Sequence, residues 1–260
     1  MKNVVYVFDL DKTIGYFTQI AIFMESIEEF IKRKLKLKEF FKLLDLFPKI
    51  FRPDAFAIFK YLKQLKKKHK YVKVLIYTNN MGPKNWVHHI RKYIEHKLDY
   101  KLFDRTIAAW KVGKVVYEKC RSGHGKSVQD IIKCSTVKKG DKICFLDDQR
   151  HSQMIHKNVD YLYLYPYKYD YDFQKMAQKL LNSNLASLIN KEKKTEFKTS
   201  VVQFAKTDPY GYRYIESIGS NPTNYDKHEI VKYLKLFFKN NKRYTITKNK
   251  KKKNKTIKKK

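Results

Sequence analysis

The sequence predicts an α/β protein with a mostly parallel sheet flanked by helices. Short apolar runs with strand character are separated by stretches of helical periodicity, the order expected of parallel strands joined by crossover helices. The predicted strands are Val4–Phe8, Val72–Tyr77, Lys142–Leu146 and Tyr161–Tyr165. At 260 residues, the chain is long enough for one such domain with an appendage.

The first predicted strand ends in the run Asp9-Leu10-Asp11-Lys12-Thr13. Because the chain curls as it leaves a strand, Asp9 and Asp11 can converge on one point beyond its carboxyl end. Such a pair suits covalent phosphoryl transfer, in which one carboxylate attacks phosphorus and the other handles the leaving group's proton. Two anions facing a phosphate imply Mg²⁺. The alternative is a polar turn in which Asp11 caps a helix.

Two other predicted strands also end in polar residues. The strand Val72–Tyr77 leads into Thr78-Asn79-Asn80, where a hydroxyl and backbone N–H groups suit phosphate oxygens, or cap the next helix. The strand Lys142–Leu146 leads into Asp147 and Asp148, an acid pair that is costly unless a cation or solvent relieves it.

A small-residue turn lies ahead of the third predicted strand. Gly123-His124-Gly125-Lys126-Ser127 enters a predicted helix over Val128–Lys133. The chain contains 58 Lys and Arg, so a single lysine is usually a solvated surface residue. Only its place in this turn distinguishes Lys126.

The order of these motifs resembles that of the haloacid dehalogenase (HAD) superfamily. The motifs are an acid pair with a threonine, a strand ending in threonine, a lysine, and a strand ending in Asp-Asp. Within it, the chain is most similar to phosphatases of the FCP/SCP type, also called NLI-interacting-factor-like, which act on the RNA polymerase II C-terminal domain. The similarity spans roughly residues 3 to 165. It includes three further segments: Arg52-Pro53, Phe103-Asp104-Arg105, and Cys120-Arg121 followed by Gly125–Ile131.

The resemblance implies a HAD-like, Rossmann-like fold and a role for each matching residue. Asp9 would be the nucleophile, and Asp11 the general acid that later activates water. Thr78, Asn79 and Lys126 would bind the phosphoryl oxygens. Mg²⁺ would be held by Asp9, the main-chain carbonyl of Asp11, and Asp147 or Asp148.

Two positions depart from the FCP/SCP pattern. Lys12 stands where that family usually has Glu, and Asp148 where it often has Asn. Neither change removes a reacting group. Residues 15–50 are expected to form a small helical insertion, because Met24–Phe47 has the apolar spacing of a helix or helix pair. It is either a small cap over a partly open site or a packing element without a substrate role.

The chain has a formal net charge of +33, with 58 basic against 25 acidic residues. Such an excess would attract phosphorylated or otherwise anionic macromolecules. Residues 239–260 contain twelve Lys and Arg, no acid and almost nothing apolar, and are expected to be a disordered basic tail. That tail would bind nucleic acid nonspecifically, act as a nuclear localisation signal or simply be solvated. The composition also resembles that of proteins from large DNA viruses.

The expected organisation is a phosphatase core over residues 1–170, a helical or irregular extension over 171–238, and the tail. Helices are predicted at Phe173–Leu181 and Lys227–Phe238. The three cysteines (Cys120, Cys134, Cys144) form no CxxC pair, so neither a disulfide framework nor a zinc site is predicted. With no signal peptide or long apolar segment, an intracellular protein, cytoplasmic or nuclear, is expected.

The predicted function is therefore Mg²⁺-dependent hydrolysis of phosphomonoesters through an aspartyl-phosphate, with a phosphoprotein, on Ser or Thr, as the favoured substrate. Two alternatives stay open. A polynucleotide phosphatase would use the same motifs on DNA or RNA ends and would explain the positive charge better. A noncatalytic basic binding module on a HAD fold is the other.

Overall fold

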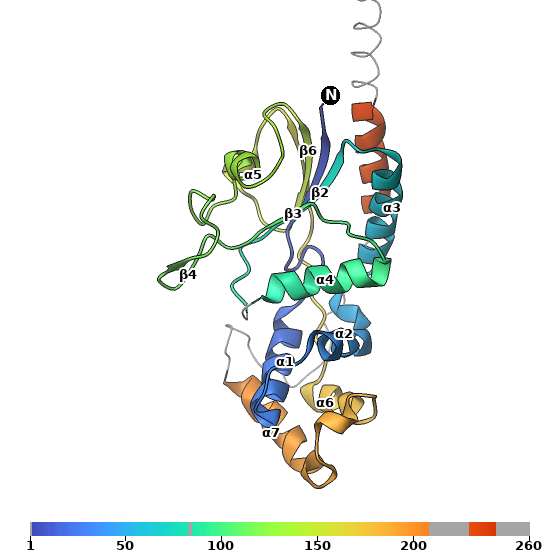
Figure 1. Ribbon diagram of the computed structural model, residues 1–260, viewed down its shortest axis with the longest axis vertical. Helices are drawn as coiled ribbons and strands as arrows, with labels where there is room; N and C mark the ends of the chain where they lie inside the picture. Colours follow the sequence, from blue (N-terminus) through green and yellow to red (C-terminus); the bar gives the residue numbers. More distant parts are fainter. Residues whose placement is uncertain (1, 83–84, 208–228, 243–260) are drawn as a thin grey trace, which may run out of the picture.

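A computed structural model of the chain describes residues 2–82, 85–207 and 229–242 (Figure 1). Its centre is a five-stranded sheet in the order β3-β2-β1-β6-β7, in which every neighbouring pair is parallel. The predicted α/β class is confirmed. The first strand along the chain, β1, lies in the middle of the sheet, so all five of its residues are buried.

The strands and helices follow one another along the chain with these bounds. The strands are β1 (Val4–Phe8), β2 (Val72–Tyr77), β3 (Arg105–Ile107), β4 (Lys111–Val112), β5 (Val115–Val116), β6 (Lys142–Asp147) and β7 (Val159–Tyr163). The α-helices are α1 (Thr18–Ile31), α2 (Leu37–Leu46), α3 (Ala55–Lys68), α4 (Trp86–Leu98), α5 (Val128–Cys134), α6 (Phe173–Leu181) and α7 (Lys194–Lys206). Residues 229–242 form a further helix. Short 3₁₀ turns are η1 (Pro48–Ile50), η2 (Ser152–Met154), η3 (Ala186–Leu188) and η4 (Lys191–Lys193).

The two faces of the sheet are covered by different helices. Alternation along β1 sends Tyr6 and Phe8 to one face and Val5 and Val7 to the other. The first face packs under α3 and the helix 229–242, whose Phe237 meets Tyr6 edge to face with ring centroids 5.5 Å apart. The second face packs under α5 (Figure 1).

Helices α1, α2, α6 and α7 form a helical module at the end of the sheet where the strands terminate (Figure 1). The module is built from two distant parts of the chain. Phe30 of α1 meets Phe197 of α7 with ring centroids 5.2 Å apart, and Lys198 of α7 donates a 2.9 Å hydrogen bond to Gln178 of α6. The predicted insertion and part of the predicted C-terminal extension are therefore one packed unit.

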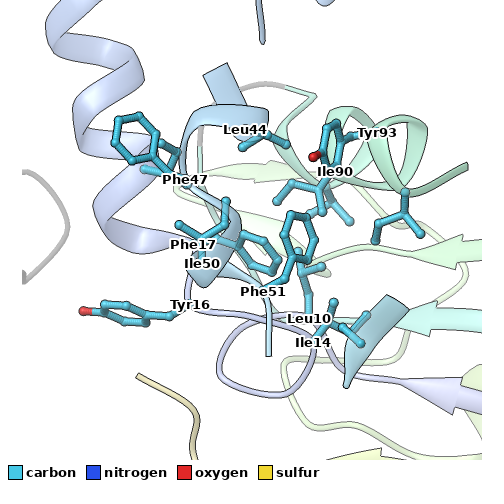
Figure 2. Packing of buried hydrophobic residues seen from close by; sticks show 14 of the residues in the cluster. Leu10, Ile14, Tyr16, Phe17, Leu44, Phe47, Ile50, Phe51, Ile90 and Tyr93 are labelled. Atoms are coloured by element: carbon cyan, nitrogen blue, oxygen red, sulfur yellow. The ribbon is translucent and has the colours of Figure 1, made fainter. Parts of the chain in front are cut away.

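Figure 2 shows how the module joins the sheet. Phe17, just before α1, meets Phe51 edge to face at 5.3 Å, and Phe51 stacks on Tyr93 of α4 at 5.5 Å. Gly15 permits this approach, because a Cβ atom there would lie 2.4 Å from the carbonyl oxygen of Ile50. The loop after β1 is thereby fixed between the sheet and the helices.

Several boundaries differ from the sequence-based expectation. Strand β7 begins and ends two residues earlier than predicted, because its residues pair with β6 from Val159 to Tyr163. The predicted helical segment Met24–Phe47 is a helix pair that breaks between α1 and α2. Helix α7 was not predicted. The last described helix runs to residue 242, four residues into the predicted tail, and residues 243–260 lie outside the described residues.

The expectation that the cysteines form no disulfide is wrong. Cys120 and Cys134 are linked, with Cα atoms 5.3 Å apart, while Cys144 is free and buried in β6. The two residues are 14 apart in sequence, and only the return of α5 beside the segment after β5 brings them together. The expected intracellular location stays a prediction. None of the described helices is both long and apolar enough to cross a membrane.

Candidate active site

The polar residues singled out in the sequence meet at the carboxyl ends of β1, β2 and β6. These are adjacent strands of one parallel sheet, so the residues that follow them emerge at the same edge. Asp9 follows β1, Thr78 follows β2, and Asp147 is the last residue of β6. Lys126 reaches the same point from the loop before α5.

Three carboxylates form the floor of the site. Single oxygens of Asp9, Asp147 and Asp148 all lie within 4.8 Å of one another, and all three side chains are buried. Thr13 orients Asp148, because its hydroxyl lies 3.2 Å from Asp148 Oδ1 and accepts a 3.1 Å hydrogen bond from the Asp148 N–H. The predicted acids of the first and last motifs are therefore brought together.

Lys126 is the one buried lysine among the described residues, with 3% of its surface exposed. Its ammonium donates to Asp9 Oδ1 at 2.5 Å and to Asp147 Oδ2 at 2.7 Å. Lys126 directly precedes Ser127, and Ser127 caps α5 by accepting a 3.1 Å hydrogen bond from the Asp130 N–H. Its place in the turn before a helix, the only sequence feature that distinguished it, is the feature that aims it at the acids.

The polar residues after β2 take different positions. Thr78 is buried, and its hydroxyl accepts a 3.1 Å hydrogen bond from the Asn80 N–H. The predicted phosphate ligand Asn79 is exposed, and its side-chain oxygen accepts from Arg121 at 2.8 Å. It is Asn80 whose side-chain amide donates to Asp11 Oδ2. Sequence reasoning missed the role of Asn80, although it belongs to the same run.

Two buried arginines, Arg52 and Arg121, hold the loops of the site, and the sequence analysis gave neither a role. Arg52 donates to the carbonyl oxygens of Thr13 and Lys12, each at 2.7 Å, and so fixes the loop after β1. In that loop Lys12 has a left-handed backbone, with φ of 57°, which curls the chain directly after Asp11. The only hint was that Arg52 belongs to a segment resembling a known family.

Burial sets the proton affinities of the two acids that follow β1. Desolvation raises the pKa of Asp9 well above its ordinary value, opposed by the charge of Lys126 and supported by that of Asp147. Desolvation also raises the pKa of Asp11 to about 6, although the hydrogen bond from Asn80 acts in the opposite direction. Asp11 is thus suited to hold a proton close to neutral pH.

The acids after β6 differ from one another. Burial acts to raise the pKa of Asp147, but His151, with Nε2 3.4 Å from Oδ2, and the charge of Lys126 outweigh it and hold that pKa below its ordinary value. For Asp148, burial and the neighbouring charge of Asp147 raise the pKa. Asp147 therefore stays anionic in the cluster.

The residues of this cluster fit a magnesium ion. The donors are carboxylate oxygens, which Mg²⁺ prefers, and Lys126 is a single positive charge facing several acids. In addition, Oδ1 of Asp11 is buried and accepts no hydrogen bond from any described residue. A second group of possible ligands, Glu118, Cys120 and Cys134, is less suitable because its sulfurs are joined in the disulfide.

A cavity of about 250 Å³ opens beside Asp11. Phe17, Thr18 and Ala21 line it from the start of the helical module, and Asn80, Met81, Gly82 and Trp86 line it from the segment between β2 and α4. Its walls are mostly apolar, with Asp11 and Asn80 at the polar end. The helical module thus borders the site and is not remote from it.

Comparisons with known proteins give one structural likeness. No protein-family model and no curated protein matches the chain. Among solved structures, the HAD domain of the effector protein Lem4 from Legionella pneumophila is similar, with 15% sequence identity and a TM-score of 0.40. The similarity covers 72% of this chain and 98% of that domain.

Mg²⁺ is expected to stabilise the protein against heat, because it would bind the folded acid cluster and not the unfolded chain. At one hundred times its dissociation constant, the gain would be about 2.7 kcal/mol. The melting temperature should rise on adding MgCl₂ at constant ionic strength. Asp147→Asn should lose the shift, whereas Asp99→Asn, at the exposed end of α4, should keep it. An equal shift in both variants would contradict the metal site.

Proposed function

We propose that this chain is a Mg²⁺-dependent phosphatase of the HAD type that hydrolyses phosphomonoesters through a phosphorylated Asp9. The observation that carries the proposal is the convergence of Asp9, Asp147, Asp148 and Lys126 in one buried cluster. Burying so much negative charge costs folding free energy and is unnecessary for packing. Together with Asp11 two residues from Asp9, the cluster supplies a nucleophile, an acid and a cation site.

In the first half-reaction, a carboxylate oxygen of Asp9 attacks phosphorus and the bond from phosphorus to the ester oxygen breaks. Asp11 donates its proton to the departing oxygen, for which its raised pKa of about 6 is suitable. Lys126 neutralises charge on the phosphoryl oxygens. The buried hydroxyl of Thr78, which follows β2 next to the end of β1, would donate to them as well. Bound Mg²⁺ would offset the repulsion between carboxylates and phosphate.

In the second half-reaction, Asp11 is ionised and takes a proton from water. The oxygen of that water attacks phosphorus, the bond to Asp9 breaks, and inorganic phosphate leaves. Asp9 returns as a carboxylate and Asp11 as an acid, so the cycle closes. Asp147 and Asp148 would hold the metal with Asp9 and the main-chain carbonyl of Asp11.

The test of this mechanism is the hydrolysis of p-nitrophenyl phosphate by the full chain and by Asp9→Asn. Turnover should require Mg²⁺, and the variant should lose it, because an amide is not a nucleophile at phosphorus. Asp99→Asn serves as a matched control and should keep full activity. Turnover that is unchanged in Asp9→Asn would contradict the mechanism, and a lack of turnover on every phosphomonoester would favour a noncatalytic binding module.

A second prediction concerns Asp11 and the leaving group. The protonated form of Asp11 is the donor in transfer to Asp9, so kcat/KM for an alkyl phosphate should fall as the pH rises through about 6. p-Nitrophenolate needs little protonation, so kcat/KM for its ester should fall much less. Asp11→Asn should lower kcat/KM on the alkyl ester by about 10²-fold or more, and far less on the aryl ester, because kcat/KM excludes the later step in which Asp11 acts as the base. Equal losses on both substrates would rule out the assignment of Asp11 as the acid.

We further propose a phosphorylated macromolecule, with a phosphoprotein favoured, as the substrate. The cavity beside Asp11 is about 250 Å³, which accommodates a side chain and leaves the rest of a polymer outside. A second cavity of about 530 Å³ lies between α6 and α7, lined by Lys175, Lys198 and Lys206 with Gln, Thr and Val and no acid. This surface and the net charge of +33 suit an anionic partner of either polymer class.

Phosphate release from a phosphoserine peptide and from a phosphorylated oligonucleotide of equal charge would decide the class. We expect faster release from the peptide. Lys175→Glu with Lys198→Glu should raise KM for the macromolecule and leave p-nitrophenyl phosphate turnover unchanged. Turnover of the oligonucleotide alone would establish the polynucleotide phosphatase instead, for which the positive charge of the chain is the favouring observation.

A further inference from the structure

The Cys120–Cys134 disulfide closes a loop around the lysine of the proposed active site. The Cα atoms of the two cysteines are 5.3 Å apart, and the segment between them contains Arg121, Lys126 and the whole of α5 up to its last residue. Lys126 lies near the middle of this loop. Its side chain is buried and contacts two carboxylates at 2.5 and 2.7 Å.

The residue next to Cys120 ties this loop to the site. Arg121 is buried and donates to the carbonyl oxygens of His124 and Gly125, at 3.1 and 3.2 Å, directly before Lys126. The same guanidinium donates to the Thr78 carbonyl at 3.2 Å and the Asn79 side chain at 2.8 Å. Arg121 therefore sets the distance between the lysine loop and the loop after β2.

The far end of the loop is fixed through α5. Ser127 caps α5, and its N–H donates to the Tyr77 hydroxyl at 3.1 Å. Asp130 of α5 accepts from the Tyr77 hydroxyl at 3.0 Å and from the Ser122 N–H at 3.0 Å. Since Cys134 ends α5, the disulfide joins the end of this helix to the backbone that carries Arg121. The backbone that carries Arg121 and the end of α5, which lie on either side of Lys126 in the chain, are thus connected by one covalent bond.

The disulfide is placed where a reductant can reach it. Cys120 is partly exposed, whereas Cys134 is buried. Arg105 lies beside the pair, donating from Nε to the Cys134 carbonyl at 3.0 Å and from Nη2 to Glu118 at 2.7 Å. The same Glu118 oxygen lies 3.2 Å from Cys120 Sγ, so the Arg105–Glu118 pair holds the backbone of Cys134 beside the side chain of Cys120.

We propose that the Cys120–Cys134 disulfide positions Lys126 and that reversible opening of this bond tunes phosphoryl transfer, an inference that rests on the proposed phosphatase function. A thiolate of a dithiol reductant attacks a sulfur of the pair, the S–S bond breaks, and the second reductant thiol closes the reductant's own disulfide. The protein gains two electrons and two protons and becomes a dithiol. Opening frees the backbone before Lys126 and loosens its ammonium from the phosphoryl site.

The experiment compares the oxidised protein with the same protein treated with dithiothreitol, and with Cys120→Ser and Cys134→Ser. Cys144→Ala is the control, because that cysteine is free. Misplacement of a group that contacts the reacting phosphate costs about ten- to a hundredfold, so kcat/KM of the reduced wild type should fall by about that factor. Both serine variants should match the reduced wild type and be insensitive to the reductant, while Cys144→Ala should behave as wild type.

Two further measurements separate this role from a merely structural one and from failure of the proposed function. Hydrogen exchange over residues 121–127 should quicken on reduction and in both serine variants, whether or not the protein turns over a substrate. A lower melting temperature with unchanged kcat/KM and unchanged exchange in this segment would overturn the inference. So would alkylation showing three free thiols in the oxidised protein. If no form of the protein hydrolyses any phosphomonoester while exchange quickens, the function fails and the positioning of the loop stands.

Discussion

The arrangement of this protein depends on carboxylates buried together at the carboxyl edge of its sheet. Single oxygens of Asp9, Asp147 and Asp148 lie within 4.8 Å of one another, and the Lys126 ammonium bridges Asp9 and Asp147. Buried like charges raise each other's pKa and weaken the fold unless a cation offsets them. Lys126 meets part of that requirement. A bound divalent ion would meet the rest, as the proposed function requires.

Much of the surrounding structure serves to hold the loops of this cluster. Arg52 fixes the loop after β1 through carbonyl oxygens, and Arg121 joins the loop after β2 to the one that carries Lys126. Tyr77, buried under α5, links the sheet to the Ser127 cap. The arginines donate to backbone oxygens, and the Tyr77 hydroxyl accepts from the Ser127 N–H, so each bond fixes a segment of backbone. The loops that carry the clustered acids and Lys126 are therefore held by a second set of residues outside the cluster.

The helical module borders the site on one side. Its two halves come from residues before α3 and after β7, and aromatic contacts such as Phe30–Phe197 join them. Phe17 and Thr18, at the start of α1, line the cavity beside Asp11. Because α1 lines this cavity and also packs on α7, the shape of the cavity depends on residues far away in the sequence.

The sequence by itself determined the class of fold and four of the five strands of the main sheet, because apolar runs are local features. It also singled out Asp9, Asp147 and Asp148, which directly follow or end such runs, and Lys126, which precedes a helix, and the structure places these four side chains together. It did not determine which neighbours the side chains would find: Asn80 contacts Asp11 while Asn79 faces Arg121. Likewise, α7, the union of two helical segments and the Cys120–Cys134 pair depend on contacts between distant residues. Only the tertiary structure decided these, since the pairing of distant residues is set by how the layers pack and not by local pattern.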